Sequence, residues 1–195
     1  MTTEIALTNG YCLTSVRAND GDDYVQLLGD GEIANTIPAI PQPYTQETAQ
    51  SWIRHRLAFL EKRAVDVCFV IRNSDGSLVG GVGVDDLIPG SAHNGEVGYW
   101  LGRESRGRGI AREAVRAFIP YAFDRLALNR LTAHTLHFNA PSIRVLEASG
   151  FKLEGRLRKY TRTASGFHDT LVFGLLKDEW SAWSNAVQPA ATADR

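Results

Sequence analysis

The sequence predicts one α/β (α+β) domain, in which helices flank a mixed, partly parallel central sheet of about seven strands. Two observations predict this class. In the first half of the chain, Asp75-Gly76 separates two apolar runs, which is a strong signal for an antiparallel hairpin. In the second half, short apolar runs alternate with runs of helical period, and this alternation favours parallel strands joined by helices.

The first half supplies the hairpin, one earlier strand and two helices. We expect strands at 11–17, 67–72 and 78–84, and helices at 20–29 and 45–64. Thr45 is a favourable N-cap for the second helix, and Glu47 lies in its first turn. Gly80, Gly81 and Gly83 in the last of these strands predict a bulge or a close approach of another backbone.

The second half alternates more regularly. We expect strands at 96–102, 130–136, 151–160 and 169–176, helices at 110–123 and 139–149, and a short helix around Trp180 and Trp183. Pro141 lies just inside the start of one helix and Gly150 just past its end, which is typical of helix boundaries. The domain is predicted at residues 1–187, and the Ala-rich tail at 188–195 is expected to be disordered.

Composition excludes several classes of protein. With 195 residues and a formal net charge of −1, bulk attraction to nucleic acid or an anionic membrane is not expected. The sequence holds no apolar run of about 18 residues and no signal peptide, so we expect a cytoplasmic protein with no membrane partner. Cys12, Cys68 and the five histidines show no metal-binding spacing, so no metal is predicted.

The segment 106–111, Arg-Gly-Arg-Gly-Ile-Ala, is the most informative of the chain. A glycine-rich turn between a strand and a helix exposes backbone N–H groups at the positive end of the helix, which favours phosphate oxygens. The segment lacks the lysine of a P-loop. It also has Arg112 where a dinucleotide-binding fingerprint needs a small residue.

Two motifs together resemble the GNAT acetyltransferase superfamily. One is Arg106-x-x-Gly109-x-Ala111; the other is Asn139-x-x-Ser142-x-Arg144-Val145-x-Glu147-x-x-Gly150-Phe151. The flanks, 96–101 and 166–169, resemble the RimJ/RimL-like branch, which acetylates N-terminal α-amines of ribosomal proteins and whose relatives acetylate small amines. The resemblance extends from about residue 11 to residue 183.

The resemblance implies a GNAT-like sheet that is splayed at its acetyl-CoA site, with acetyl-CoA as co-substrate. Backbone amides of 106–111 would hold the pyrophosphate, and 99–102 would pair with the pantetheine. The implied cofactor-binding residues are Tyr99, Trp100, Leu101, Arg106, Gly107, Arg108, Gly109, Ile110, Ala111 and Asn139. Two alternatives stay open: Asn139 as a helix N-cap, and Arg108 as part of a solvated face.

Acetyl transfer to an amine needs a base for the ammonium and a proton for the departing thiolate. Two bases are candidates: the strand geometry favours Glu96, whereas spacing within the RimJ/RimL-like match favours Glu104. Either could instead be a surface carboxylate. Many GNAT enzymes carry a tyrosine acid where this chain has Leu146, and the resemblance implies Ser142 as the acid. A helix cap is the alternative for Ser142.

These residues predict an N-acetyltransferase that works by direct attack in a ternary complex. The acceptor would be a primary amine, either a protein N-terminus or a small molecule. The alternative is a non-catalytic module that binds or senses acyl-CoA. We expect residues 33–44 to build the acceptor pocket, with Tyr160, His168 and Asp169 beside it, and exposed apolar residues in 33–44 leave a homodimer contact open.

Overall fold

The structure is a computed structural model that describes residues 3–29, 31–85 and 93–187; the expected tail at 188–195 lies outside these residues. The strands are β1 (Glu4–Ala6), β2 (Cys12–Ser15), β3 (Cys68–Arg72), β4 (Leu78–Asp85), β5 (Asn94–Leu101), β6 (Arg130–Leu136), β7 (Lys152–Thr163) and β8 (Gly166–Leu176). The helices are α1 (Gly21–Leu28), α2 (Gln46–Arg63), α3 (Ile110–Asp124), α4 (Ala140–Ala148) and α5 (Lys177–Val187), with short 3-10 turns η1 (Thr8–Gly10), η2 (Ile33–Asn35) and η3 (Arg103–Ser105).

The strands form one sheet in the order β1-β2-β3-β4-β5-β6-β8-β7. The pair β5–β6 is parallel, and the other neighbouring pairs are antiparallel. Helix α3 connects the parallel pair, as a parallel connection requires. The mixed, partly parallel sheet that the sequence predicted is therefore confirmed.

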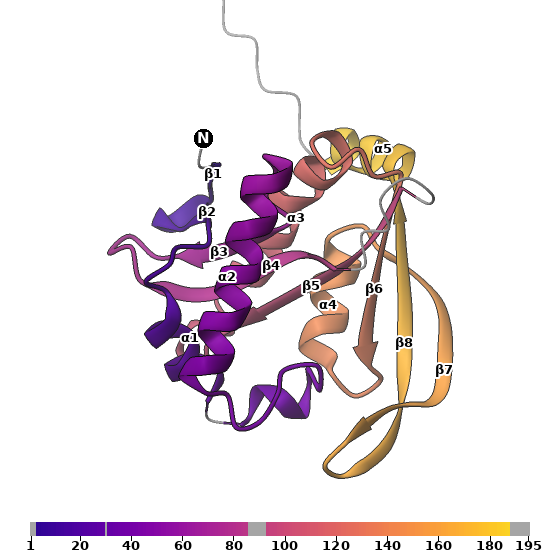
Figure 1. The fold of residues 1–195 in the computed structure, drawn as a ribbon. Coiled ribbons are helices and arrows are strands. Elements are labelled where there is room, and N and C mark those ends of the chain that lie inside the picture. Colours follow the sequence, from indigo (N-terminus) through magenta and orange to yellow (C-terminus); the bar gives the residue numbers. More distant parts are fainter. Residues whose placement is uncertain (1–2, 30, 86–92, 188–195) are drawn as a thin grey trace, which may run out of the picture.

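The sheet splays between β5 and β6. These strands pair at three positions, from Asn94↔Arg130 to Glu96↔Thr132. Beyond Glu96, β5 continues along β4 to Leu101, whereas β6 continues along β8 to Leu136. Figure 1 shows the two strands diverging toward the lower part of the view. We call the space between their diverging ends the β5–β6 gap.

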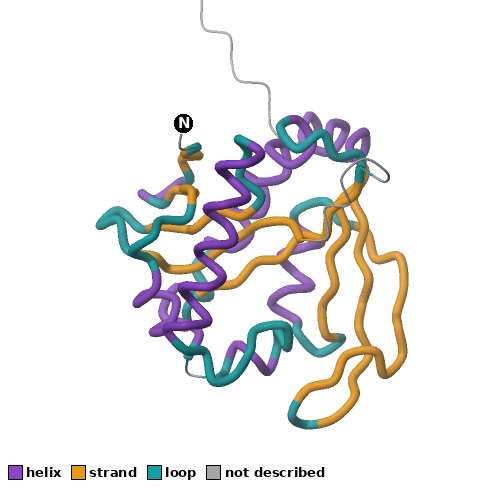
Figure 2. Tube along the Cα trace, in the orientation of Figure 1, coloured by secondary structure: helices purple, strands orange, loops and turns teal. Residues whose placement is uncertain are grey.

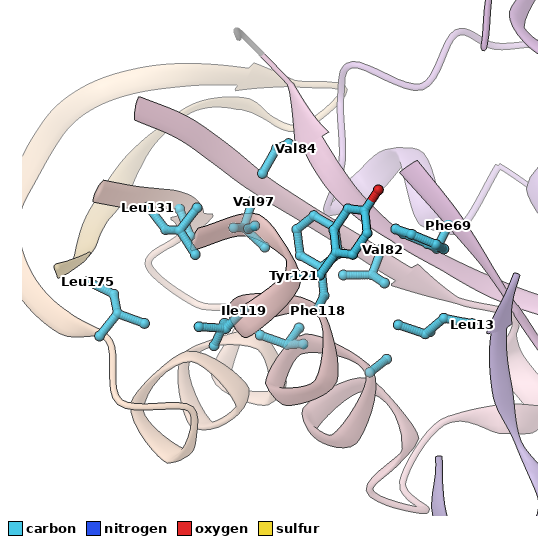
Figure 3. Close-up of a cluster of buried hydrophobic side chains, with 14 of the residues drawn as sticks. Leu13, Phe69, Val82, Val84, Val97, Phe118, Ile119, Tyr121, Leu131 and Leu175 are labelled. Carbon is cyan, nitrogen blue, oxygen red and sulfur yellow. The ribbon is translucent and has the colours of Figure 1, made fainter. Parts of the chain in front are cut away.

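Helices cover both faces of the sheet (Figure 2). A large core cluster joins one face to α3 and α4, through fully buried Phe118 and Leu146 among others. Within it, Phe69 and Tyr121 meet edge to face, with ring centroids 4.9 Å apart (Figure 3). A second cluster joins the opposite face to α1 and α2 around Tyr24 and Ile53. Because α3 is anchored along its buried stripe, the turn before it has a fixed position.

The glycines of β4 allow close approach of neighbouring backbones, as predicted. A Cβ atom at Gly80 would lie 2.4 Å from the Trp100 carbonyl oxygen, and one at Gly83 would lie 2.6 Å from the Val67 carbonyl oxygen. The register of β3 against β4 also shifts between Ile71 and Arg72. Small residues here let β4 hold β5 in place beside the gap.

Two parts of the sheet differ from the prediction. The sheet has eight strands rather than about seven, because Glu4–Ala6 pairs with β2. A three-residue strand is too short to show an alternating pattern. The last hairpin is also longer: β7 runs to Thr163 and β8 starts at Gly166, so most of the loop expected at 161–168 is strand.

Candidate active site

The glycine turn between β5 and α3 has the backbone geometry of an anion site. Gly107 and Gly109 have φ of +76° and +80°, in the left-handed region that favours glycine. Within the described part of the chain, no hydrogen bond uses the N–H groups of residues 107–112. These groups surround the N-terminus of α3, where the helix dipole favours negative charge. The turn is therefore suited to an anion.

The arginines of this turn differ in their partners. Arg106 donates from Nε to the Leu101 carbonyl oxygen over 3.0 Å and from a terminal nitrogen to Glu32 Oε1 over 3.0 Å. Arg103 pairs with the other oxygen of Glu32. Arg108 is exposed, and Ile110 is buried in the core. Arg106 thus braces the end of β5 against the segment before η2, and the backbone amides remain the groups open to a ligand.

Strand β5 directs alternate side chains to the two faces of the sheet. Val97, Tyr99 and Leu101 belong to the cluster with α3 and α4. Trp100 lies on the opposite face, where its ring centroid is 5.7 Å from that of Tyr24 in α1. Glu96 shares the face of Trp100, because the two are four residues apart on one strand. The gap therefore has one set of side chains on each face.

On the α4 face, Tyr99 reaches the first turn of α4. Its hydroxyl lies 2.7 Å from Ser142 Oγ and donates to the Ser142 carbonyl oxygen over 3.1 Å. Burial raises the pKa of Tyr99 to about 12, and the hydrogen bond with Ser142 acts in the opposite direction. Asn139 is the N-cap, since its Oδ1 accepts from the Ser142 backbone N–H over 3.3 Å. Asn139 therefore caps α4, and the Ser142 hydroxyl bonds Tyr99.

On the opposite face, Glu96 pairs with His134. Glu96 Oε1 lies 2.8 Å from His134 Nδ1, and about a third of each side chain is exposed. The His134 ring stacks with that of Tyr160 on β7, with centroids 6.4 Å apart. These residues come from three strands, β5, β6 and β7. They gather at the point where β5 and β6 separate.

The two candidate bases lie at opposite ends of β5. Glu104 is an exposed residue of η3, beyond the end of the strand. From Glu96 to Leu101 alone the strand advances about 16 Å at about 3.3 Å per residue. The structure places Glu96, and not Glu104, beside another titratable side chain across the gap. One reacting amine cannot contact both carboxylates.

The other expected acceptor-side residues lie on the β7–β8 hairpin. Asp169 accepts from Arg156 Nε over 2.6 Å and from the Lys159 backbone N–H over 2.8 Å. Both hydrogen bonds lower the pKa of Asp169, and the bond from the Lys159 backbone N–H has the larger effect. The His168 ring bonds the hydroxyls of Thr163 and Ser165 near the hairpin end. Asp169 and His168 therefore fix the hairpin itself, whereas Tyr160 contacts the Glu96–His134 pair.

Two contacts of this site were missed by the sequence interpretation. His134 was assigned no role, and Tyr99 was expected to contribute through its backbone. The signal for His134 is the parallel register Glu96↔Thr132, which brings position 134 beside Glu96 only once the strands are paired. Among the residues that the structure describes, no three His, Cys, Asp or Glu side chains form a group that could hold a metal. In that same set, no helix is long and apolar enough to cross a membrane.

Comparison with known proteins identifies the class. The family model for the acetyltransferase (GNAT) domain matches residues 11–152. The uncharacterized N-acetyltransferase p20 of Bacillus licheniformis is 30% identical over 178 residues, which cover 91% of this chain and 99% of that protein. The structure of ribosomal-protein-S5-alanine acetyltransferase from Vibrio fischeri is 25% identical, with a TM-score of 0.78 over 92% of this chain and 98% of that chain.

A third similarity concerns the fold alone. RimL, the ribosomal L7/L12 alpha-N-protein acetyltransferase solved in complex with coenzyme A, is 18% identical and has a TM-score of 0.79 over 91% of this chain and 99% of that chain. Fold and site together define an acyltransferase. The chain belongs to the GNAT acetyltransferase family and is an N-acetyltransferase, similar to the RimJ/RimL-like ribosomal-protein enzymes within it.

Proposed function

We propose that this protein transfers the acetyl group of acetyl-CoA to a primary amine by direct attack in a ternary complex. One observation carries the proposal. A carboxylate paired with a histidine, Glu96 and His134, lies on one face of the sheet beside the β5–β6 gap. A paired hydroxyl, Tyr99 with Ser142, lies on the other face. A base on one side and a proton donor on the other are what amine acylation by a thioester needs.

The donor end of the site fits acetyl-CoA. The uncommitted amides of 107–112 suit its pyrophosphate, with the dipole of α3 adding about 0.3–1 kcal/mol. Beyond Glu96, β5 has a free edge on the side of the gap, where its backbone groups can pair with the amides of a pantetheine arm. When bound, acetyl-CoA supplies an activated acetyl thioester.

On the face opposite α4, Glu96 takes a proton from the incoming ammonium, directly or through water, so that the neutral amine can attack. With a proton on Nδ1, His134 donates to Glu96 and holds its carboxylate toward the gap. A backbone N–H on the free edge of β5 stabilises the negative charge that develops on the thioester oxygen. The new C–N bond forms as the C–S bond breaks.

On the α4 face of the sheet, Ser142 gives its hydroxyl proton to the departing thiolate. The Tyr99 hydroxyl, 2.7 Å from Ser142 Oγ, turns its proton from the Ser142 carbonyl oxygen to the serine oxygen as charge develops there. The products are an N-acetylated amine and the free thiol of CoA. As the amide forms, its nitrogen loses a second proton, which passes through water to Ser142 and restores the serine hydroxyl, and the proton on Glu96 returns to solvent.

The acceptor that we propose is a primary amine, either the N-terminal α-amine of a protein or the amine of a small molecule. Two relatives support a protein acceptor by their names. One is the Vibrio fischeri enzyme. The other is the [ribosomal protein uS5]-alanine N-acetyltransferase of Escherichia coli, 26% identical over 104 residues that cover 53% of this chain and 54% of that protein.

The test combines acetyl-CoA turnover with binding. The purified protein is incubated with acetyl-CoA and a panel of free-amine peptides and small amines, and release of free thiol is measured. CoA binding is measured separately by calorimetry. Thiol release that depends on an amine supports the proposal. If CoA binds but no amine of the panel releases thiol, the protein is an acyl-CoA sensor with this fold and the proposal is wrong.

A further inference from the structure

The end of the β7–β8 hairpin carries a concentrated positive charge. We call residues 157–168 the hairpin tip. It contains Arg158, Lys159 and Arg162 and no Asp or Glu, although the whole chain has a net charge of −1. The register of β7 against β8 shifts between Leu157 and Thr161, where Lys159 has φ +50°, so the cations lie on a short, irregular stretch of the hairpin.

Nearby carboxylates do not neutralise this charge, because each already pairs with another cation. Asp169 pairs with Arg156 and Glu154 with Arg130. By contrast, no ion pair of the described residues involves Arg158, Lys159 or Arg162. The three cations of the hairpin tip are therefore open to an external anion.

Exposed aromatic rings accompany these cations. Tyr160 is 64% exposed and Phe167 is 61% exposed, and Arg162 lies over the Phe167 ring at 5.8 Å. Phe138, after β6, is 49% exposed, and its ring lies 5.1 Å from that of His168. Large exposed rings beside arginines are characteristic of the residues that dominate protein–protein interfaces.

The hairpin tip is continuous with the proposed base. Tyr160 belongs to it and stacks on His134, which pairs with Glu96. The link at 33–44, expected to build the acceptor pocket, contains no charged residue. Link and hairpin tip both lie at the lower end of the molecule in Figure 1. Tyr160 thus connects the basic hairpin tip, through His134, to the carboxylate of Glu96.

We propose that the hairpin tip binds the acidic N-terminal segment of a polypeptide acceptor, whose carboxylates contact Arg158, Lys159 and Arg162 while its α-amine lies at Glu96. This deepens the proposed function and rests on it. Repulsion from the three cations disfavours polycationic acceptors such as polyamines. Among primary amines, the surface thus selects acidic peptides.

The test uses matched sets of short synthetic peptides with free N-termini. They share a first residue and differ in carrying Asp and Glu, Asn and Gln, or Lys in the next positions. In thiol-release assays, the acidic set is expected to show a KM about tenfold below that of the neutral set, with similar kcat. Raising the ionic strength to about 0.5 M should remove most of this difference.

Two triple variants assign the effect to the hairpin tip. Arg158→Gln/Lys159→Gln/Arg162→Gln is expected to raise the KM of the acidic peptides about tenfold and leave the neutral set within about twofold. The control, Arg54→Gln/Lys62→Gln/Arg63→Gln, removes the same charge from exposed positions of α2 and should preserve the preference. Equal effects of both variants, or no preference between peptide sets, would overturn the inference.

A binding readout separates this inference from the proposed function. Peptides labelled at the C-terminus are titrated with the protein and CoA, and fluorescence anisotropy is followed. Acidic peptides that bind through the hairpin tip without acetylation would support the inference and contradict the proposed function. Equal acetylation of acidic and neutral peptides would support the proposed function and contradict the inference. If a short RNA displaces the acidic peptide and binds more tightly through the same cations, the acidic-peptide assignment is wrong.

Discussion

The donor end and the acceptor end of the β5–β6 gap are built from different parts of the chain. At the donor end, the glycine turn at 106–111 offers backbone amides of consecutive residues. At the acceptor end, Glu96, His134 and Tyr160 come from three strands and meet through their side chains. One region depends on φ and ψ, and the other depends on the identity of particular side chains.

This difference separates the expected effects of mutation. A backbone-built site tolerates most side chains but not the loss of a left-handed glycine. A side-chain-built site loses its chemistry when a single functional group is replaced. Changes at the acceptor end should therefore lower kcat, whereas changes at the turn should weaken donor binding.

The largest effect is expected at Glu96. Glu96→Gln removes the proposed base while keeping its size, and kcat should fall about 100-fold or more, with CoA affinity unchanged. Glu104→Gln, at the other end of β5, is the matched control and should keep kcat within about twofold. Steady-state kinetics with a saturating amine measure both. A larger loss of kcat in Glu104→Gln than in Glu96→Gln would place the base at the donor end and contradict the comparison.

A substitution at Gly109 tests the donor end. Valine is strained at φ +80°, so Gly109→Val should displace the turn and weaken CoA binding about 30-fold, as expected from the loss of one strong amide–phosphate hydrogen bond. Gly76→Val places the same side chain at φ +80° in the β3–β4 hairpin. Calorimetry and thermal melts should show similar losses of stability, with CoA binding weakened in Gly109→Val alone. Similar CoA affinity in both variants would contradict an anion site at the turn.

The hydroxyl pair on the α4 face is expected to have a smaller effect. Ser142→Ala should lower kcat about tenfold and Tyr99→Phe about threefold, with little change in the KM for acetyl-CoA. Ser149→Ala is a control in the same helix segment, because the buried Ser149 hydroxyl has no hydrogen-bond partner within the described structure. An unchanged kcat in Ser142→Ala would leave the thiolate to be protonated by water.

The pH dependence tests the same pair. Burial raises the pKa of Tyr99 to about 12, so its phenol stays protonated through the ordinary assay range. The wild-type pH–rate profile should therefore show no falling limb from Tyr99 below about pH 11. A loss of rate near pH 10 that disappears in Tyr99→Phe would show that this phenol titrates as an exposed tyrosine does.

The smallest effect is expected at Glu32, which lies before η2 and pairs with Arg103 and Arg106 at the donor end. Partly exposed ion pairs contribute about 0–1 kcal/mol, so Glu32→Gln should change the melting temperature little. Because the substitution removes a carboxylate that competes with the phosphates of CoA for the two arginines, CoA should bind up to about threefold more tightly. Glu61→Gln on α2 is the control. Weaker CoA binding in Glu32→Gln would show that Glu32 favours CoA binding by holding Arg103 and Arg106 in place, and that its negative charge does not weaken it.

The difference between a turn built from consecutive backbone amides and a site built from distant side chains also explains what the sequence could predict. The turn at 106–111 and helix α4 are local features, punctuated by Gly109, Pro141 and Gly150, and their positions were correctly predicted. Strand β1 was missed because three residues carry no periodic pattern. Residues 161–168 of the hairpin tip were expected to be a loop, because their polar side chains conceal the strand pattern.

The contacts of the candidate site lie beyond such local signals. Glu96 and His134 meet because α3 returns the chain to form a parallel pair, whose register no short motif specifies. Tyr99 and Ser142 are 43 residues apart and meet only when α4 covers β5. The sequence therefore indicated the donor turn and named both carboxylates, and the tertiary structure was needed to distinguish their surroundings.

The divergence of β5 from β6 gives the sheet a third edge, inside the molecule. The outer edges are protected in familiar ways, since β1 has three residues and β7 is rich in arginine and lysine. An open edge elsewhere would recruit another strand and promote aggregation. Here helices cover both faces of the sheet, and Tyr99 spans from β5 to α4, so another strand cannot approach. The backbone N–H and C=O groups of this edge would promote aggregation at the surface. Inside the molecule they can pair with one narrow chain that carries amide groups.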